Sequence, residues 1–387
     1  MRTALVLSLA LTISLRTAAQ SGTGPIEEAM QLQADMRESV FKALAGGRST
    51  YTPGVGGGLQ GQLEAMVGRE DIVPARAAGA CEPLTGDPLA LIADEARKTN
   101  IVIINESHAS PRHRHFIGEL LPVLRREGYD TYATETLAHQ ELNHPGVLGS
   151  DGWYSNEPIF ARTLRTAKAL GYRLVPYEET PEQVRAAAAK ISRETVMNRR
   201  DASQVENLMS AIFTTRPDAK VLIHVGVAHV TERRRPGDAG TVFMAERLKS
   251  ATGRDPLTIS QDACPASGSK SELARARRLA DGALGEIPGV DFTVGHPALA
   301  LRDGRPEWRQ LAGDKPAAVP GAFLGSREEV IVEARPQGTP LTEVPIDRLF
   351  LRPGERLPLL LPPGKYRVDG FTRAGRIGGD PVLLEVK

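Results

Sequence analysis

Between residues 87 and 262 the chain alternates short, uninterrupted apolar segments with longer helical ones, and this alternation constrains the fold more than any other feature. The predicted strands are 101–104, 131–133, 172–175, 221–225 and 257–260. The predicted helices are 87–98, 111–126, 156–170, 181–213 and 240–249. Strands that are apolar on both faces are typical of a parallel sheet covered by helices on both sides. The sequence therefore predicts an α/β fold with a parallel sheet and helices on both faces.

The regions that flank this alternation have different patterns. Residues 25–47 predict an amphipathic helix, and a Gly-rich loop follows over 53–61. In the last part of the chain, short strand-like runs are separated by Pro and Gly, a pattern typical of a small antiparallel β-sandwich. Between these parts we expect a charged helix over 271–284 and a strand over 291–294.

A chain of 387 residues is long enough for two or three domains. We expect an N-terminal helical and Gly-rich region over 20–86, an α/β domain over 87–319 and a small β domain over 320–387. Few apolar contacts are expected across residues 313–322, so a chain that ends near Pro320 should still fold.

The charge balance excludes one class of partner. The sequence has 48 Lys and Arg against 47 Asp and Glu, a net charge of +1, which gives no field that would attract nucleic acid. The motifs of serine hydrolases, P-loop NTPases and dinucleotide-binding proteins are missing in their expected contexts. A small-molecule ligand or substrate is the partner that these observations leave.

The N-terminus has the three parts of a signal peptide. Arg2 precedes an apolar run over 4–15, and small residues at 17–19 give a cleavage site before Gln20. The run is shorter than the roughly 20 residues that span a bilayer, and no Cys follows it as a lipid anchor. An uncleaved anchor is the alternative. We expect residues 1–19 to be a signal peptide and the mature protein to be periplasmic or secreted, with no membrane span.

The two cysteines, Cys81 and Cys264, lie in loop-like contexts. An oxidising compartment would allow them to form a disulfide, but the sequence does not show that they meet. Their spacing fits no zinc motif.

Ionisable side chains follow four successive predicted strands. Because ligands of open parallel sheets bind outside the carboxyl ends of the strands, we expect these side chains to converge on one pocket. Its predicted members are Glu106, His108, Glu135 and His229, with Tyr177, Glu178 and His113 at the margin. For His115 we favour a solvated position at the start of the helix.

This combination of residues favours two kinds of chemistry. His108, His229 and Glu135 offer the nitrogen and oxygen ligands that suit zinc, manganese, iron or cobalt. Glu106 and Glu135, crowded together and partly buried, are expected to have raised pKa values, which suits general acid–base catalysis. No H-E-x-x-H motif is present, so the metal prediction depends on the assembled fold.

Four segments of the chain resemble the Tiki/TraB/ChaN/erythromycin-esterase superfamily. They are IVIINESHASPRHRHF, YATETL, RRDASQVENLM and VLIHVGVAHV, and the resemblance covers about residues 87–262. It implies a parallel α/β core with a Glu-x-His after the first strand, a Glu after the second and a late G-x-x-H. Glu106 with His108, Glu135, and Gly226 with His229 match these elements.

Further matches point to different branches of the superfamily. Pro111 and His113 resemble the haem-binding ChaN-like branch, whereas Arg200 with Asp201 looks like the arginine-bearing helix of the esterase branch. Asn105 stands where the Tiki branch has Gly, and the C-terminal β segment is additional.

The resemblance implies two classes of function. One is an exported haem- or metal-binding protein, in which His113, Tyr177 and Glu178 would line the cofactor. The other is an exported hydrolase that acts on an ester, lactone or peptide bond. Aromatic residues make up 5% of the chain, which argues against a large porphyrin pocket in a monomer, although a homodimer could share one.

The predicted cleavage site before Gln20 can be tested in exported protein. Protein secreted to the periplasm should begin at or near Gln20, because the small residues that signal peptidase recognises lie at 17–19. N-terminal sequencing of periplasmic protein tests this. Material that retains Met1 to Ala19 would contradict it.

Overall fold

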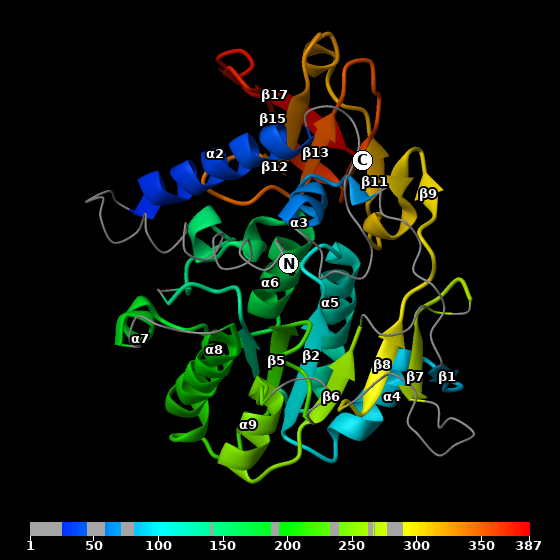
Figure 1. The fold of residues 1–387 in the computed structure, drawn as a ribbon. Helices are drawn as coiled ribbons and strands as arrows, with labels where there is room; N and C mark the ends of the chain where they lie inside the picture. The colour runs from blue at the N-terminus through cyan, green and yellow to red at the C-terminus, as the bar shows by residue number, and fades with distance from the viewer. Residues whose placement is uncertain are drawn as a thin grey trace.

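The computed structural model describes residues 25–44, 59–70, 81–139, 142–186, 193–232, 240–261, 266, 268–276 and 289–387. Its largest element is a sheet of eight strands in the order β1-β7-β8-β6-β2-β5-β3-β4 (Figure 1). The bounds are β1 (Cys81–Pro83), β2 (Ile101–Glu106), β3 (Thr131–Thr134), β4 (Arg173–Pro176), β5 (Val221–Gly226), β6 (Leu257–Ser260), β7 (Glu272–Ala276) and β8 (Phe292–Gly295). The predicted signal peptide over 1–19 and Cys264 lie outside the described residues.

The sheet is parallel from β8 to β4, and β7 and β1 extend it in the antiparallel sense. The predicted parallel core is therefore confirmed. The helix predicted over 271–284 is wrong over Glu272–Ala276, which form β7, and the rest of it lies outside the described residues. Glu, Leu, Ala and Arg favour helix intrinsically. Here the hydrogen bonds to β8 and the burial of Leu273 and Ala274 outweigh that preference.

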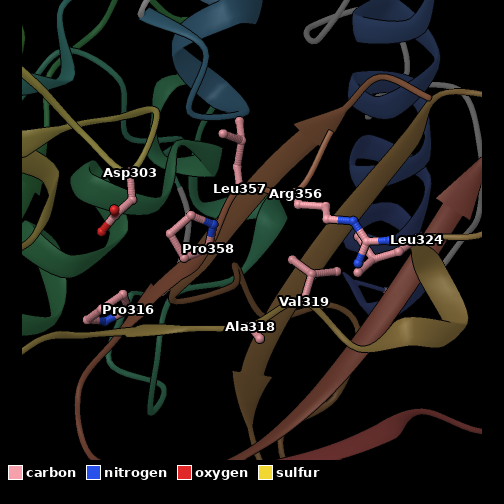
Figure 2. A pocket seen from close by; sticks show the side chains of 8 residues that line it. All are labelled: Asp303, Pro316, Ala318, Val319, Leu324, Arg356, Leu357 and Pro358. Atoms are coloured by element: carbon pink, nitrogen blue, oxygen red, sulfur yellow. The ribbon is translucent and has the colours of Figure 1, made fainter. Parts of the chain in front are cut away.

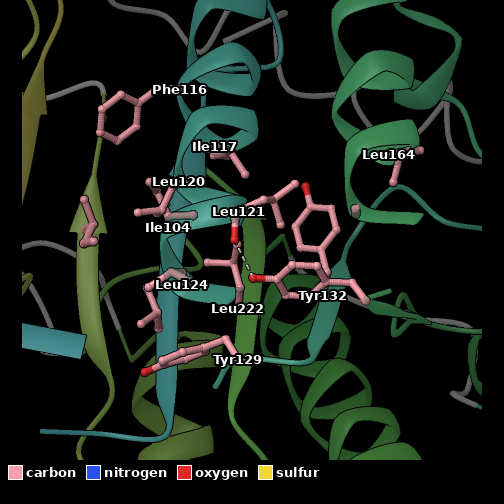
Figure 3. Close-up of a cluster of buried hydrophobic side chains, with 14 of the residues drawn as sticks. Ile104, Phe116, Ile117, Leu120, Leu121, Leu124, Tyr129, Tyr132, Leu164 and Leu222 are labelled. Carbon is pink, nitrogen blue, oxygen red and sulfur yellow. Dashed lines mark hydrogen bonds between the residues drawn. The ribbon is translucent and has the colours of Figure 1, made fainter. Parts of the chain in front are cut away.

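Helices cover both faces of the sheet, as predicted. One face carries α4 (Pro88–Ala96), α5 (Pro111–Arg126) and α6 (Pro158–Ala169). Figure 3 shows Leu120 and Leu121 of α5 beside Ile104 of β2 and Leu222 of β5. The other face is covered by α8 (Arg193–Leu208), the π-helical turn η4 (Met209–Phe213) and α9 (Met244–Thr252). None of the helices in the described residues is long and apolar enough to cross a membrane.

Capping side chains fix where two of these helices begin. Asp87 accepts a hydrogen bond from the Ala90 amide at 3.1 Å, and Glu157 accepts one from Phe160 at 2.8 Å. A proline follows each cap, at the position where the missing N–H costs nothing. The predicted helix over 181–213 contains α7 (Pro181–Ala186), α8 and η4, with 187–192 outside the described residues.

A small antiparallel β domain follows the α/β domain. Its main sheet has the order β13-β12-β15-β16, with β17 also paired to β15. The strands are β12 (Val330–Pro336), β13 (Asp347–Leu351), β15 (Gly364–Thr372), β16 (Gly375–Arg376) and β17 (Val382–Val386). A second pair joins β11 (Lys315–Ala317) to β14 (Leu359–Leu361). The predicted β domain is confirmed, and its boundary at 319/320 stays a prediction, although β11 precedes that boundary and pairs beyond it.

Shorter elements connect these parts. The hairpin of β9 and β10 follows β8, and the described connections contain four 3-10 turns. Their bounds are β9 (Leu301–Arg302), β10 (Arg305–Pro306), η2 (Gly149–Asp151), η3 (Tyr154–Asn156), η5 (Glu307–Arg309) and η6 (Gly321–Phe323).

The N-terminal helices pack on the β domain. In Figure 1, α2 (Pro25–Leu44) and α3 (Leu59–Met66) lie beside β12 and β13. Their side chains share one buried cluster with Ile331 and Phe350. The predicted Gly-rich loop over 53–61 is wrong from Leu59, where α3 begins, and residues 53–58 lie outside the described residues. Apolar contacts do cross residues 313–322, contrary to the expectation from the sequence.

Buried arginines add to this interface. Arg348 of β13 donates to Glu333 at 2.8 Å, to Gln33 of α2 at 2.6 Å and to the Asn156 carbonyl at 2.7 Å. Its guanidinium thus holds β12, α2 and the turn before α6 together. Charged groups this deeply buried are tolerated only when such partners surround them.

We expect Phe350→Ala to destabilise the whole chain by about 3–5 kcal/mol, because it removes a fully buried ring shared by the β domain and the N-terminal helices. Urea denaturation monitored by circular dichroism measures the change. Leu383→Ala is the control: Leu383 is 63% exposed on β17, and its loss should cost less than about 0.5 kcal/mol. Equal effects of the two changes would contradict this packing.

Candidate functional site

The site lies at the carboxyl ends of four neighbouring strands, β2, β5, β3 and β4. Glu106 is the last residue of β2, and Glu135 directly follows β3. Glu178 comes two residues after β4, and His229 three residues after β5. Parallel pairing places these ends at one edge of the sheet, and the contacts described below join all of these side chains.

Glu106 is the centre of the first half of the site. Its carboxylate accepts hydrogen bonds from Arg114 Nε at 2.6 Å and Arg114 Nη2 at 2.8 Å. It also contacts His108 Nδ1 at 2.8 Å and His224 Nε2 at 3.0 Å. Burial raises the pKa of Glu106, but Arg114 and His224 more than offset this and hold the pKa well below its ordinary value. Glu106 is therefore an ionised acceptor.

His108 is held with one ring nitrogen bound and the other directed into the site. Because Glu106 is ionised, the Nδ1 that faces it carries a proton, so in the neutral imidazole the lone pair is on Nε2. Nε2 lies 3.9 Å from Glu135 Oε1, too far for a hydrogen bond. The ring stacks on Tyr154, with centroids 3.9 Å apart, and 14% of the side chain is exposed.

Arg200 of α8 is the centre of the second half of the site. It donates to Glu178 through Nε at 2.9 Å and Nη2 at 2.5 Å, and to Glu135 Oε1 at 2.5 Å. The other oxygen of Glu135 accepts from the Gly226 amide at 2.6 Å. Burial raises the pKa of Glu135, but Arg200 and then His229 outweigh it, so the pKa lies below its ordinary value.

His229 completes this half. Its Nδ1 lies 2.5 Å from Asp201 Oδ1, and its Nε2 lies 2.9 Å from Arg200 Nη1. Burial lowers the pKa of His229, but the Asp201 carboxylate outweighs this and raises the pKa above its ordinary value. Arg200 Nη1 can donate to Nε2 only while His229 is neutral, with its single proton on Nδ1.

Gly226 allows the two halves to meet. A Cβ atom at this position would lie 3.1 Å from His108 Nε2 and 3.2 Å from Glu135 Oε2. Any larger residue would therefore push against both side chains. This contact gives a physical reason for glycine in the G-x-x-H segment.

The residues predicted to line a cofactor are engaged in internal contacts. His113 Nδ1 accepts from the Ser107 amide at 3.0 Å, and the ring stacks on His296 at 5.1 Å. The Tyr177 hydroxyl donates to the His224 carbonyl at 2.8 Å, and Glu178 holds Arg200. Their cofactor role stays a prediction. His115 is not simply solvated as expected, since it stacks on Trp308 at 6.3 Å.

The predicted metal ligands do not fit a metal ion. The guanidinium of Arg200 binds both Glu135 and His229, which places a permanent cation where the metal would share them with His108. Within the described residues, no group of three or more His, Cys, Asp and Glu side chains is arranged to hold a metal. The expectation of raised pKa values for Glu106 and Glu135 is also wrong, because buried arginines outweigh desolvation at both carboxylates.

Three further side chains shape the site without being singled out by the sequence pattern. Arg114 stands in a basic helix start, and Tyr132 and His224 stand in apolar strands. A histidine in the middle of the run VLIHVG is nevertheless a signal in the sequence, since a buried imidazole needs partners.

A cavity of 380 Å³ lies elsewhere, in the β domain. Figure 2 shows its walls, which come mainly from the segments around β11 and β14. The lining residues are Asp303, Pro316, Ala318, Val319, Leu324, Arg356, Leu357 and Pro358. None of them belongs to the cluster of ionisable groups at the strand ends.

No protein-family model matches the chain, and no curated protein has significant sequence similarity to it. Among solved structures, the type III effector HopBA1 is 16% identical over 56% of this chain and 100% of its own, with a TM-score of 0.31. The RRSP effector domain of a Vibrio vulnificus MARTX toxin is 18% identical over 55% of this chain and 38% of its own (TM-score 0.31). ChaN of Campylobacter jejuni, solved with cofacial haem, is 9% identical over 54% of this chain and 92% of its own, with a TM-score of 0.33. Likenesses this low do not assign a function to this chain.

The lowered pKa values predict sensitivity to acid. Both carboxylates titrate below their unfolded value of 4.5, so their ionisation stabilises the fold above that pH, and this stabilisation is lost as the pH falls further. We expect the free energy of unfolding to drop between about pH 4.5 and pH 2, and Glu135→Gln to reduce that slope. Urea denaturation at a series of pH values measures both.

Asp94→Asn is the control for this experiment, because Asp94 lies on the surface with 62% of its side chain exposed. It should leave the pH slope unchanged. If Glu135→Gln has the wild-type slope, Glu135 does not have the lowered pKa described here.

Proposed function

We propose that this protein is a metal-independent hydrolase of an ester, lactone or peptide bond. The observation that carries the proposal is the position of His108: Nδ1 lies 2.8 Å from the Glu106 carboxylate, and Nε2 faces Glu135 across the site. In the neutral imidazole this contact places the proton on Nδ1 and the lone pair on Nε2. A histidine oriented in this way by a carboxylate is the arrangement of a general base.

In this mechanism His108 Nε2 removes a proton from a water molecule, whose oxygen attacks the carbonyl carbon of the substrate. The proton is later passed to the leaving group when the carbon–heteroatom bond breaks. His108 forms polar or ring contacts with Glu106, Glu135, Arg114 and Tyr154. Among the described residues no serine or cysteine side chain forms a hydrogen bond with its ring, so water is the nucleophile that the geometry favours.

Arg200 can stabilise the negative charge that develops on the carbonyl oxygen. A guanidinium has five N–H donors. Arg200 uses four of them in hydrogen bonds to described residues. The remaining N–H is on Nη1, and 17% of the side chain is exposed. Glu178 and Glu135 hold this cation in place before substrate arrives, as electrostatic preorganisation requires.

Haem binding is the competing prediction from the family resemblance. Superfamily membership, export to the periplasm and the haem ligand all remain proposals. A Soret band that appears on haem titration and is lost in His113→Ala would favour haem binding over hydrolysis.

We expect His108→Ala to lower kcat/KM by about 100-fold or more, because general-base catalysis contributes of that order. The free energy of unfolding should change by no more than about 1 kcal/mol, since both oxygens of Glu106 stay bonded to Arg114 when the imidazole is lost. A panel of chromogenic esters, lactones and peptides, assayed with and without a chelator, identifies the substrate class and provides the rates.

His115→Ala is the matched control. His115 lies on α5, shortly after His108 in the sequence, but its contacts are with Glu119 and Trp308, and its loss should leave kcat/KM unchanged. Activity that disappears with a chelator and returns with a divalent metal would show that the metal-independent mechanism is wrong.

A further inference from the structure

A buried chain of hydrogen bonds reaches His108 from the interior of the sheet. The Tyr132 hydroxyl of β3 lies 2.8 Å from His224 Nδ1 of β5, and His224 Nε2 lies 3.0 Å from Glu106 Oε2. Glu106 Oε1 then contacts His108 Nδ1 at 2.8 Å. Tyr132, His224 and Glu106 are each at most 2% exposed, so no bulk water competes for these contacts.

When His224 and His108 are both neutral, the protons in this chain have one consistent arrangement. Glu106 only accepts, so the nitrogens that face it, His224 Nε2 and His108 Nδ1, both carry protons. A neutral His224 then has its lone pair on Nδ1, which accepts the hydroxyl proton of Tyr132. Burial raises the pKa of Tyr132 well above its ordinary value, so this hydroxyl keeps its proton.

His224 also determines which oxygen of Glu106 remains for His108. Arg114 donates to both carboxylate oxygens. The N–H of His224 occupies the Oε2 side, which leaves Oε1 as the acceptor for His108. The backbone carbonyl of His224 in addition accepts from Tyr177 and from the Glu135 amide at 3.2 Å, so one residue touches both halves of the site.

We propose that His224 is a positioning residue that fixes the Glu106 carboxylate and thereby selects the tautomer of His108 in which Nε2 is free. The catalytic consequence rests on the proposed hydrolase function, but the tautomer of His108 does not. A purely structural role would require only that the imidazole form hydrogen bonds and pack against its neighbours. One of these neighbours is Phe160, whose ring centroid lies 4.9 Å from that of His224.

Two amide variants of the full-length protein separate these roles. His224→Gln can place a side-chain N–H near the position of Nε2 and so restore the bond to Glu106. His224→Asn carries the same amide on a chain one methylene shorter, near Tyr132 but out of reach of Glu106. Nitrogen-15 NMR of the histidine side chains, with His108 assigned from His108→Ala, reports the tautomer without any substrate.

We expect wild type and His224→Gln to show His108 protonated on Nδ1, and His224→Asn to show a mixture of tautomers. With the ester or peptide found by the substrate panel, His224→Asn should lower kcat about tenfold or more with little change in KM, because a misoriented base fails after binding. His224→Gln should recover most of that loss.

The proposal is overturned if His224→Asn keeps the wild-type tautomer, or if His224→Gln is as impaired as His224→Asn. If wild type hydrolyses no substrate, the proposed function fails, and the tautomer measurement still decides the role of His224.

Discussion

The buried ion pair between Arg114 and Glu106 is the interaction on which the first half of the site depends. It joins the start of α5 to the end of β2, and both side chains are at most 2% exposed. Burying two charges costs several kcal/mol each unless every polar atom finds a partner. Here His108 and His224 supply those partners, and the Arg114 guanidinium also lies over the rings of Tyr154 and Phe160. The orientation of His108 follows from this one carboxylate.

Arg200 has the same role in the second half of the site, where it gathers Glu135, Glu178 and His229. The two halves meet at Gly226, whose missing side chain leaves room for His108 beside Glu135. A site organised by two arginines keeps its carboxylates ionised. This favours roles in orientation and electrostatic stabilisation, and leaves proton transfer to the histidines.

Glu157 connects this site to the rest of the molecule. It caps α6, approaches Arg114 Nη1 at 3.6 Å, and accepts from Arg309 at 3.2 Å. Arg309 in turn binds Glu70, which follows α3. The N-terminal helices, the turn η5 and the strand-end cluster thus share one network of buried charges. Arg348 of β13 joins the β domain to it through the carbonyl of Asn156, the residue before Glu157, so the β domain supports the α/β domain.

The sequence by itself determined the parallel core, because continuous apolar strands are stable only when helices cover both faces, and it placed ionisable residues at the strand ends for the same topological reason. It also located Glu106, His108, Glu135, Glu178 and His229 at one edge. Only the tertiary structure decided the strand β7, since pairing with β8 outweighed the helical preference of its residues. The low pKa values and the part played by His224 also came from tertiary contacts. Desolvation raises the pKa of a buried carboxylate, and ion pairing lowers it. Which effect is larger depends on whether an arginine from elsewhere in the chain lies within hydrogen-bond distance.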